Sequence, residues 1–292
     1  MKTLLLGSSG QLGKNLVTTC PREFQLQSLN RSELDILNYE DLRNKILEFK
    51  PDYIINATGY TNVEKAETNQ SLAYNINQKG INNIVKIINE VNSTIIHFST
   101  DYVFDGKKNG SYNELDHTNP ISVYGKSKLF GENEIINQTQ KYLIFRISWL
   151  YSEEQNNFIW KVFNFSNENQ DIYKIVNDQK GIPTYAKELS FNIWEIMKDS
   201  FLSKKFGIYH YCDKGKASTW FEIAIFISDY MTNKGYNFPK ILPCSSDDYK
   251  SVVNRPKNSC FDTQKINKTF CLKQNNWKDN MNKVLNSYIG KL

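Results

Sequence analysis

Long hydrophobic runs, paired cysteines and blocks of basic residues are all missing from this sequence of 292 residues. A membrane-spanning helix needs roughly 18 or more consecutive apolar residues, so we expect no membrane span and no membrane partner. The net charge of +5 comes from scattered Lys and Arg side chains and gives no support for a nucleic-acid partner. The apolar residues before Gly7 are too few for a signal peptide and lead into a glycine turn, so we expect a cytoplasmic protein.

Cysteine and histidine, the usual ligands of structural metals, are sparse. The sequence has five cysteines and three histidines. The cysteines lie far apart and form no Cys-x-x-Cys pair, which is typical of free thiols in a reducing compartment. No histidine has carboxylates at ligand spacing, so we expect no metal site.

Apolar segments alternate with amphipathic segments along the first half of the chain. We predict strands at residues 2–6, 24–29, 53–57, 94–98 and 142–147, and helices at 11–20, 39–49, 72–91 and 124–138. This order predicts an α/β fold with a doubly wound parallel sheet of the Rossmann type. We assign the Rossmann domain to residues 1–150 and a smaller α/β domain to 151–292, with 172–212 returning to the sheet.

A glycine-rich turn follows the first predicted strand and opens the first predicted helix. It contains Gly7, Gly10 and Gly13, with Gln11 and Leu12 between the last two. Small residues let the backbone approach a pyrophosphate, and a helix N-terminus offers free N–H groups and partial positive charge. The turn therefore predicts a dinucleotide-binding site.

The residues after the second predicted strand indicate which dinucleotide binds. An NAD site usually has a ribose-binding acid there, but this chain has Arg31. A guanidinium can pair with the 2′-phosphate of NADP, so the sequence favours NADP(H), with NADH as the alternative. Asp35 and Ile36 follow closely and are placed to line the adenine pocket.

Three polar side chains form a candidate catalytic group. Thr100 follows a buried strand, at the edge where open α/β sheets bind ligands. Tyr124 and Lys128 are four residues apart, so they share one face of a helix. A nearby cation lowers the pKa of a Tyr from about 10 toward the range useful for proton transfer. The alternatives are a chance Tyr-x-x-x-Lys spacing and a turn or helix cap at Ser99-Thr100.

An ordered series of motifs resembles the extended short-chain dehydrogenase/reductase superfamily and, within it, the family of dTDP-4-dehydrorhamnose reductases. The resemblance covers almost the whole chain. The motifs that carry it include Gly7-x-x-Gly10-Gln11-Leu12-Gly13, Ser99-Thr100-Asp101-Tyr102-Val103-Phe104, Val123-Tyr124-Gly125-x-x-Lys128, Arg146-x-Ser148-Trp149 and Arg255-Pro256-x-Asn258-Ser259.

The resemblance implies an NADP-dependent oxidoreductase with a nucleotide-sugar substrate. It would use NADPH to reduce the 4-keto group of dTDP-4-dehydro-L-rhamnose to dTDP-L-rhamnose, a precursor of cell-surface polysaccharide. It implies Tyr124 as the proton donor, Lys128 as its pKa tuner and ribose anchor, and Thr100 as a hydrogen-bonding partner of the keto oxygen. The implied substrate contacts are Thr100, Asp101, Trp149 and Arg255. The implied cofactor contacts are Gly7, Gly10, Gln11, Leu12, Gly13, Arg31, Asp35, Ile36, Ala57, Gly59, Tyr60, Thr61, Asn75, Tyr124 and Lys128.

Several alternatives stay open. A sugar-nucleotide dehydratase would have Glu where Tyr102 stands, and an epimerase usually keeps an acid after the second strand. Two further alternatives stay open. One is a reductase of another nucleotide-activated 4-keto-6-deoxy sugar, and the other is a non-catalytic NADP-binding regulatory subunit. Thr58 replaces an alanine usual in the family, which leaves NADH open. Some relatives use Mg²⁺ in dimer contacts; this sequence shows no acidic cluster for it, and a homodimer stays open.

Overall fold

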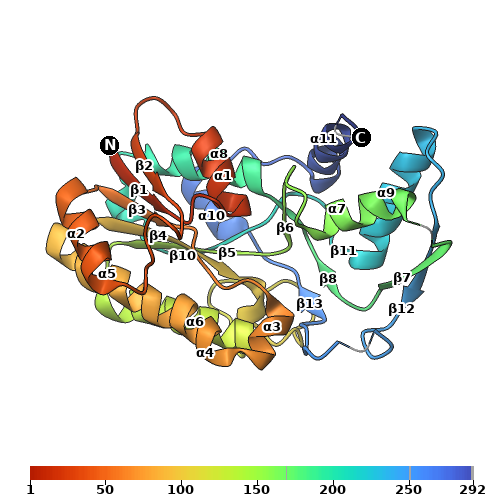
Figure 1. Ribbon diagram of the computed structural model, residues 1–292, viewed down its shortest axis with the longest axis horizontal. Helices are drawn as coiled ribbons and strands as arrows, with labels where there is room; N and C mark the ends of the chain where they lie inside the picture. The colour runs from red at the N-terminus through yellow and green to blue at the C-terminus, as the bar shows by residue number, and fades with distance from the viewer. Residues whose placement is uncertain (169, 250, 291–292) are drawn as a thin grey trace.

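A six-stranded parallel sheet forms the centre of the larger lobe in our computed structural model, which describes residues 1–168, 170–249 and 251–290 (Figure 1). The strand order is β10-β5-β4-β3-β1-β2, and every neighbouring pair is parallel. The strands are β1 (Lys2–Leu6), β2 (Gln25–Leu29), β3 (Tyr53–Asn56), β4 (Thr94–Thr100), β5 (Tyr142–Ile147) and β10 (Gly207–Tyr211). Since β2 and β3 flank β1, the chain reverses its winding there. The prediction of a doubly wound parallel sheet is confirmed.

Helices cover both faces of this sheet, which explains why its strands are apolar on both sides. Leu5 packs into the core on one face and its neighbour Leu4 into the core on the other, because successive side chains of a strand point in opposite directions. The first face carries α1 (Gln11–Thr18), α8 (Ala186–Met197) and α10 (Gln264–Phe270). The second carries α2 (Tyr39–Phe49), α5 (Gly80–Val91) and α6 (Val123–Gln138).

The smaller lobe, on the right of Figure 1, has an apolar core of its own. Its helices are α7 (Phe158–Phe163), α9 (Trp220–Asn233) and α11 (Trp277–Ile289). Three short sheets complete it: β7 (Ile172–Val176) with β12 (Lys240–Cys244), β8 (Lys180–Gly181) between β11 (Ser218–Thr219) and β13 (Asn258–Ser259), and β6 (Leu150–Tyr151) with β9 (Thr184–Tyr185). Thr219 and Glu222 form a capping box that opens α9.

The segment 172–212 divides between the two lobes. β10 joins the central sheet beside β5, as expected, but β7 pairs with β12 in the smaller lobe. Ile172 at the start of β7 is 47% exposed, which a strand buried on both faces would not allow. The structure therefore corrects the expectation for residues 172–176. The domain division near residue 150 stays a prediction.

The helix predicted at 72–91 is interrupted. It consists of α4 (Gln70–Tyr74), a π-helical turn at Asn75–Lys79, and α5. A π-helical turn adds a residue to the helix and changes the direction of the side chains that follow. Here it coincides with Asn77, whose amide points inward. In the described part of the chain, no helix is long and apolar enough to cross a membrane.

Candidate active site

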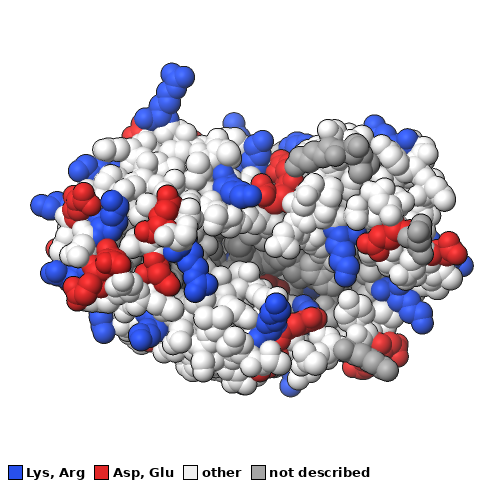
Figure 2. Space-filling model, viewed as in Figure 1, with Lys and Arg blue, Asp and Glu red and all other residues white. Residues whose placement is uncertain are grey.

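A cleft of about 1410 Å³ runs between the lobes, and Figure 2 shows the surface hollowed there. Residues that follow β1, β3, β4 and β5 line one side of it. This is the edge at which open parallel sheets bind ligands. The smaller lobe supplies the opposite wall, so a ligand in the cleft would touch both lobes.

The three glycines of the turn after β1 have different roles. Gly7 has a φ of +88°, and a Cβ there would lie 2.8 Å from the carbonyl carbon of Ala57. A Cβ on Gly13 would lie 2.1 Å from the oxygen of Gly7. At Gly10 the nearest atom would be 3.5 Å away, so only this glycine leaves open space in front of α1. Gly10 is also the N-cap of α1 and offers no side-chain cap, which suits a pyrophosphate at the free N–H groups.

Gly10, Gln11 and Leu12 line the cleft, whereas Gly7 and Gly13 lie behind it and shape the turn. The amide of Gln11 donates a hydrogen bond to the carbonyl of Leu150 at 3.1 Å. This contact ties the turn to the segment that carries Trp149. The residues present therefore fit a dinucleotide, as the sequence predicts.

A chain of hydroxyl groups leads from Tyr124 into the protein. Ser122 caps α6 by accepting the N–H of Gly125 at 3.1 Å, which sets Tyr124 in the first turn. The Tyr124 hydroxyl is hydrogen-bonded to Thr100. Thr100 in turn donates to the carboxylate of Asp101 at 3.0 Å.

Asp101 is almost fully buried, at 3% exposure. Burial raises its pKa to about 6, against the opposing effect of nearby hydroxyls on Ser259 and Thr100. Its Oδ2 atom lacks a hydrogen bond of normal geometry. A buried acceptor without a partner is costly, which agrees with the raised pKa of this carboxyl.

Lys128 does not contact the phenol of Tyr124 in the way we expected. Its Nζ donates to the carbonyl of Phe98 at 2.6 Å and lies 3.4 Å from Nε2 of His97. Burial lowers the pKa of Lys128 to about 8. Burial also raises the pKa of Tyr124 above its ordinary value. Desolvation is therefore the larger effect at both groups, and the role of Lys128 as the pKa tuner of Tyr124 stays a prediction.

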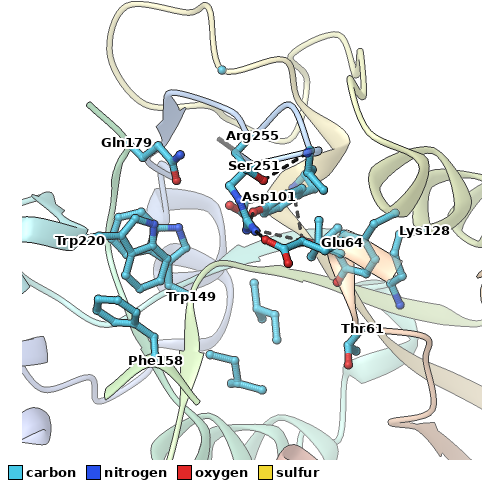
Figure 3. Close-up of a pocket in the computed structure, with 18 of the residues that line it drawn as sticks. Thr61, Glu64, Asp101, Lys128, Trp149, Phe158, Gln179, Trp220, Ser251 and Arg255 are labelled. Atoms are coloured by element: carbon cyan, nitrogen blue, oxygen red, sulfur yellow. Dashed lines mark hydrogen bonds and ion pairs between the residues drawn. The ribbon is translucent and has the colours of Figure 1, made fainter. Parts of the chain in front are cut away.

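An aromatic wall faces these groups from the smaller lobe (Figure 3). Trp149 stacks on Trp220 with ring centroids 3.7 Å apart and planes at 17°. Phe158 packs against Trp220 at 4.5 Å. Behind Trp149, a Cβ on Gly181 would lie 2.7 Å from the indole, so only glycine admits the ring. Trp149 was expected at the site; Trp220 and Phe158 were not, although the capping residue Thr219 could have drawn attention to Trp220.

The backbone of Trp149 is in the left-handed region, with a φ of +47°. A bulky residue there costs about 1–2 kcal/mol and needs strong local support. Ser148 and Thr184 provide it, because the Thr184 hydroxyl donates to the Ser148 carbonyl at 2.6 Å and the Thr184 N–H donates to the Trp149 carbonyl at 3.2 Å. The left-handed backbone at Trp149 is therefore held by the two hydrogen bonds from Thr184, and its side chain lines the cleft.

Arg255 reaches across the cleft and is already paired. Its guanidinium donates to the Tyr102 hydroxyl at 3.0 Å. It also donates to the Glu64 carboxylate at 3.2 Å (Figure 3). Glu64 belongs to α3 (Val63–Thr68) of the larger lobe. No local pattern indicates the pair of Arg255 and Glu64, since the partners are 191 residues apart.

The residues expected at the adenine end lie outside the cleft itself. Arg31 is largely exposed and lies 3.9 Å from Asp35, a separation at which the pair contributes little. Asp35 accepts the N–H of Leu37 at 3.0 Å and so fixes its own loop. Ile36 is buried and packs directly against Gly80, because a Cβ on Gly80 would lie 2.4 Å from its Cδ1 atom. The loop is built around Ile36, with Arg31 free at the surface.

Among the residues expected around the nicotinamide, Ala57, Gly59 and Thr61 line the cleft. Tyr60 and Asn75 do not, and Asn75 is exposed. The inward amide in this helix belongs to Asn77. It accepts the N–H of Tyr60 at 2.8 Å, and it donates to the Tyr60 carbonyl at 3.1 Å and to Ser127 at 2.9 Å. Asn77 thus holds this loop, and a cofactor contact of Asn75 stays a prediction.

Metal ligands do not gather in the described part of the chain: no group of three or more His, Cys, Asp or Glu side chains there could hold an ion. The five cysteines are free thiols, as expected. Burial raises the pKa of Cys212 and of Cys260, which makes these thiols poor nucleophiles.

Comparison with known proteins agrees with this geometry. The family model described as RmlD substrate binding domain matches residues 1–289. A dTDP-4-dehydrorhamnose reductase of Aggregatibacter actinomycetemcomitans is 36% identical over 283 residues, which is 95% of this chain and 96% of that protein.

Solved structures give the same result. The dTDP-4-dehydrorhamnose reductase of Bacillus anthracis, crystallised in complex with NADP, superposes with a TM-score of 0.89 at 30% identity, covering 97% of this chain and 98% of that one. A dTDP-4-dehydrorhamnose reductase of Clostridium acetobutylicum superposes with a TM-score of 0.90 at 31% identity, covering 98% and 99%. The chain therefore belongs to the RmlD substrate-binding-domain family.

Proposed function

We propose that the protein is an NADPH-dependent oxidoreductase that reduces the 4-keto group of dTDP-4-dehydro-L-rhamnose to give dTDP-L-rhamnose. The observation that carries the proposal is that Thr100, Tyr124 and Lys128 all line one cleft. The glycine turn and the aromatic wall line the same cleft. The names of the relatives give the substrate class. We also propose that the enzyme acts in the cytoplasm, with its five free cysteines as support.

NADPH, when bound, supplies the hydride that reduces C4 of the sugar. Gly10, Gln11 and Leu12 would hold its pyrophosphate, Asp35 and Ile36 would lie toward the adenine, and Ala57, Gly59, Tyr60 and Thr61 toward the nicotinamide. Arg31 is exposed and only weakly paired, so it is free to meet a 2′-phosphate, which supports NADPH over NADH.

Tyr124 holds the proton for the C4 oxygen. The raised pKa of Tyr124 keeps the phenol protonated at neutral pH, and a reduction needs a protonated donor. Once negative charge develops on the oxygen, Tyr124 donates the proton, and the Thr100 hydroxyl, which donates to Asp101 in this structure, would turn to give the same oxygen a second hydrogen bond. Lys128, one helical turn from Tyr124, would stabilise the phenolate that remains and anchor the nicotinamide ribose.

The smaller lobe would hold the nucleotide sugar. We place the sugar between Asp101 and the aromatic wall formed by the stacked rings of Trp149 and Trp220. Arg255 would bind the diphosphate with its planar fork of donors. To do so it must release Glu64, so substrate binding exchanges one ion pair for another.

The test is the rate of NADPH oxidation with purified protein and dTDP-4-dehydrorhamnose, compared with other nucleotide-activated 4-keto-6-deoxy sugars at equal concentration. We expect the highest kcat/KM with dTDP-4-dehydrorhamnose. A clear preference for another sugar would replace the substrate, and NADPH binding without turnover of any sugar would favour the regulatory-subunit alternative.

A further inference from the structure

We propose that Gln179 selects the base of the nucleotide sugar, with its Oε1 atom accepting a hydrogen bond from the ring N–H group of thymine or uracil. The inference deepens the proposed function and rests on it, because it names the part of the nucleotide that the smaller lobe would recognise. Gln179 lines the cleft and is only 6% exposed. It lies in the turn between β7 and β8 and has no role in the steps proposed for the sugar.

The position of Gln179 follows from the short sheet next to the aromatic wall. β8 and β11 are antiparallel, with Lys180 opposite Thr219. One further step of this register puts Gln179 opposite Trp220, and opposite residues of an antiparallel pair have their Cβ atoms roughly 4.5–5.5 Å apart on one face. In agreement, Figure 3 shows Gln179, Trp220 and Trp149 at the same end of the cleft. The Gln179 amide therefore lies at the aromatic wall.

Hydrogen bonds fix the orientation of the Gln179 amide. The Ser246 hydroxyl donates its single proton to Oδ1 of Asp178 at 2.6 Å. The same hydroxyl therefore accepts, and Nε2 of Gln179 donates to it at 2.9 Å. Burial alone would raise the pKa of Asp178, but hydrogen bonds from Ser246 and Lys257 outweigh it and lower this pKa below its ordinary value. Asp178 thus stays charged at neutral pH and holds the Ser246 proton.

The oxygen end of this amide is left for a ligand. Among residues 1–168, 170–249 and 251–290, no donor forms a hydrogen bond with Oε1 of Gln179. Figure 3 shows this end of the side chain directed into the cleft. Because Ser246 holds Nε2 on the other side, the amide presents one fixed acceptor to a bound molecule.

Position along the cleft indicates which part of the nucleotide sugar meets this acceptor. Lys128 and Gln179 lie at opposite ends of the site in Figure 3, with Arg255 between them. In the proposed function the sugar lies at the Lys128 end and the diphosphate at Arg255, so the base reaches the Gln179 end. Phe158 and Ile175 also line the cleft and pack into the apolar core of the smaller lobe, an environment that suits a flat base better than a sugar rich in hydroxyl groups.

The ring N–H group separates the pyrimidine bases. Thymine and uracil carry a hydrogen on N3 between two carbonyl groups, whereas N3 of cytosine is an acceptor without a hydrogen. Oε1 of Gln179 therefore gains a hydrogen bond from thymine or uracil and meets a lone pair on cytosine. Nε2 has a second hydrogen beyond the one given to Ser246, and it can donate to a carbonyl of the same base.

The experiment is isothermal titration calorimetry of the protein saturated with NADP⁺, with dTDP and N3-methylthymidine 5′-diphosphate as ligands. The methyl group of the second ligand replaces the ring hydrogen and changes nothing else. The wild type should bind the methylated nucleotide about 5- to 100-fold more weakly than dTDP. Gln179→Ala removes the acceptor and makes room for the methyl group, so its affinities for the two ligands should agree within about twofold. Equal affinities in the wild type, or an unchanged ratio in Gln179→Ala, would overturn the proposal.

Gln274→Ala is the matched control. Gln274 is buried to a similar degree, but its amide donates to the Cys212 carbonyl at 2.8 Å and lies outside the lining of the cleft. The control should keep the preference of the wild type for dTDP, and an equal loss of preference there would contradict the role of Gln179. If Gln179→Ala does not fold, dCDP decides with the wild type: it should bind at least about fivefold more weakly than dTDP, and equal binding would overturn the proposal.

This binding assay separates the role of Gln179 from the proposed function. It involves no turnover, so a protein that reduces no 4-keto sugar can still show the preference for the ring N–H group. A protein that reduces dTDP-4-dehydrorhamnose but binds both nucleotides equally would refute the role of Gln179 alone. A protein that binds no dTDP would refute both.

Discussion

Gly10 and Gly13 provide a paired test of the cofactor site, because alanine at the two positions should fail in different ways. Gly10 has φ −73° and ψ 166°, values that alanine adopts freely, and its Cβ would meet nothing closer than 3.5 Å. Gly10→Ala should therefore change the free energy of unfolding by less than about 1 kcal/mol. The new methyl group, however, fills the space where a pyrophosphate would approach the N–H groups of α1.

The cost to cofactor binding follows from the contacts that would be lost. A hydrogen bond to a charged group contributes about 1.5–3 kcal/mol, and 1.4 kcal/mol is a factor of about ten in Kd. Gly10→Ala should then weaken NADPH binding by about 10- to 100-fold. Gly13→Ala brings its Cβ to 2.1 Å from a backbone oxygen, so α1 must move away from β1. It should lose about 2–3 kcal/mol of stability or more.

Urea unfolding and titration of NADPH fluorescence separate the two effects. The reasoning fails if Gly10→Ala binds NADPH as tightly as the wild type. It fails equally if Gly10→Ala is as unstable as Gly13→Ala, since the turn would then have no open side for a phosphate.

Three further predictions concern other parts of the cleft. Glu64→Gln removes the partly exposed ion pair of Arg255, which contributes about 0.2–1 kcal/mol. The KM for the nucleotide sugar should then fall by up to about fivefold at unchanged kcat. A raised KM would mean that Glu64 holds Arg255 in the position that binds substrate. Arg31→Ala should lower kcat/KM with NADPH by about tenfold and leave the value with NADH unchanged, and an equal loss with both cofactors would remove Arg31 from the 2′-phosphate site. Burial raises the pKa of Asp101 to about 6, whereas an aspartate in an unfolded chain has a pKa of roughly 4. The protonated carboxyl therefore contributes its full stability to the folded protein below about pH 4, and this contribution is lost as the pH rises through about 6. Asp101→Asn should avoid a loss of the order of 2–3 kcal/mol between pH 4 and pH 7 in urea unfolding, and parallel stability profiles for variant and wild type would contradict this.

Much of the larger lobe could be predicted because its signals are local. Continuous apolar runs such as Ile95-Ile96 identify buried parallel strands, and polar residues directly after them lie at the ligand edge by topology alone. Thr100 and Tyr124 follow from this rule and from helical spacing. The motif series gave the family, which the comparisons show.

The features that could not be predicted depend on contacts distant in sequence or on burial. Spacing puts Lys128 and Tyr124 on one face of α6, but it cannot tell that the amine turns to the Phe98 carbonyl or that desolvation dominates both pKa values. The pairing of β7 with β12 and of Arg255 with Glu64 joins segments with no local signal for each other.

The central claim is that Tyr124 donates a proton to the sugar oxygen during NADPH-dependent reduction. The most direct test is kcat for dTDP-4-dehydrorhamnose in Tyr124→Phe, with Tyr102→Phe as the control. The ring of Tyr102 lies 5.5 Å from that of Tyr124, but its hydroxyl bonds Arg255 instead. Tyr124→Phe should bind NADPH normally and lose about 10²- to 10⁴-fold in kcat, while Tyr102→Phe keeps most of its turnover. Equal turnover in Tyr124→Phe and the wild type would contradict the account.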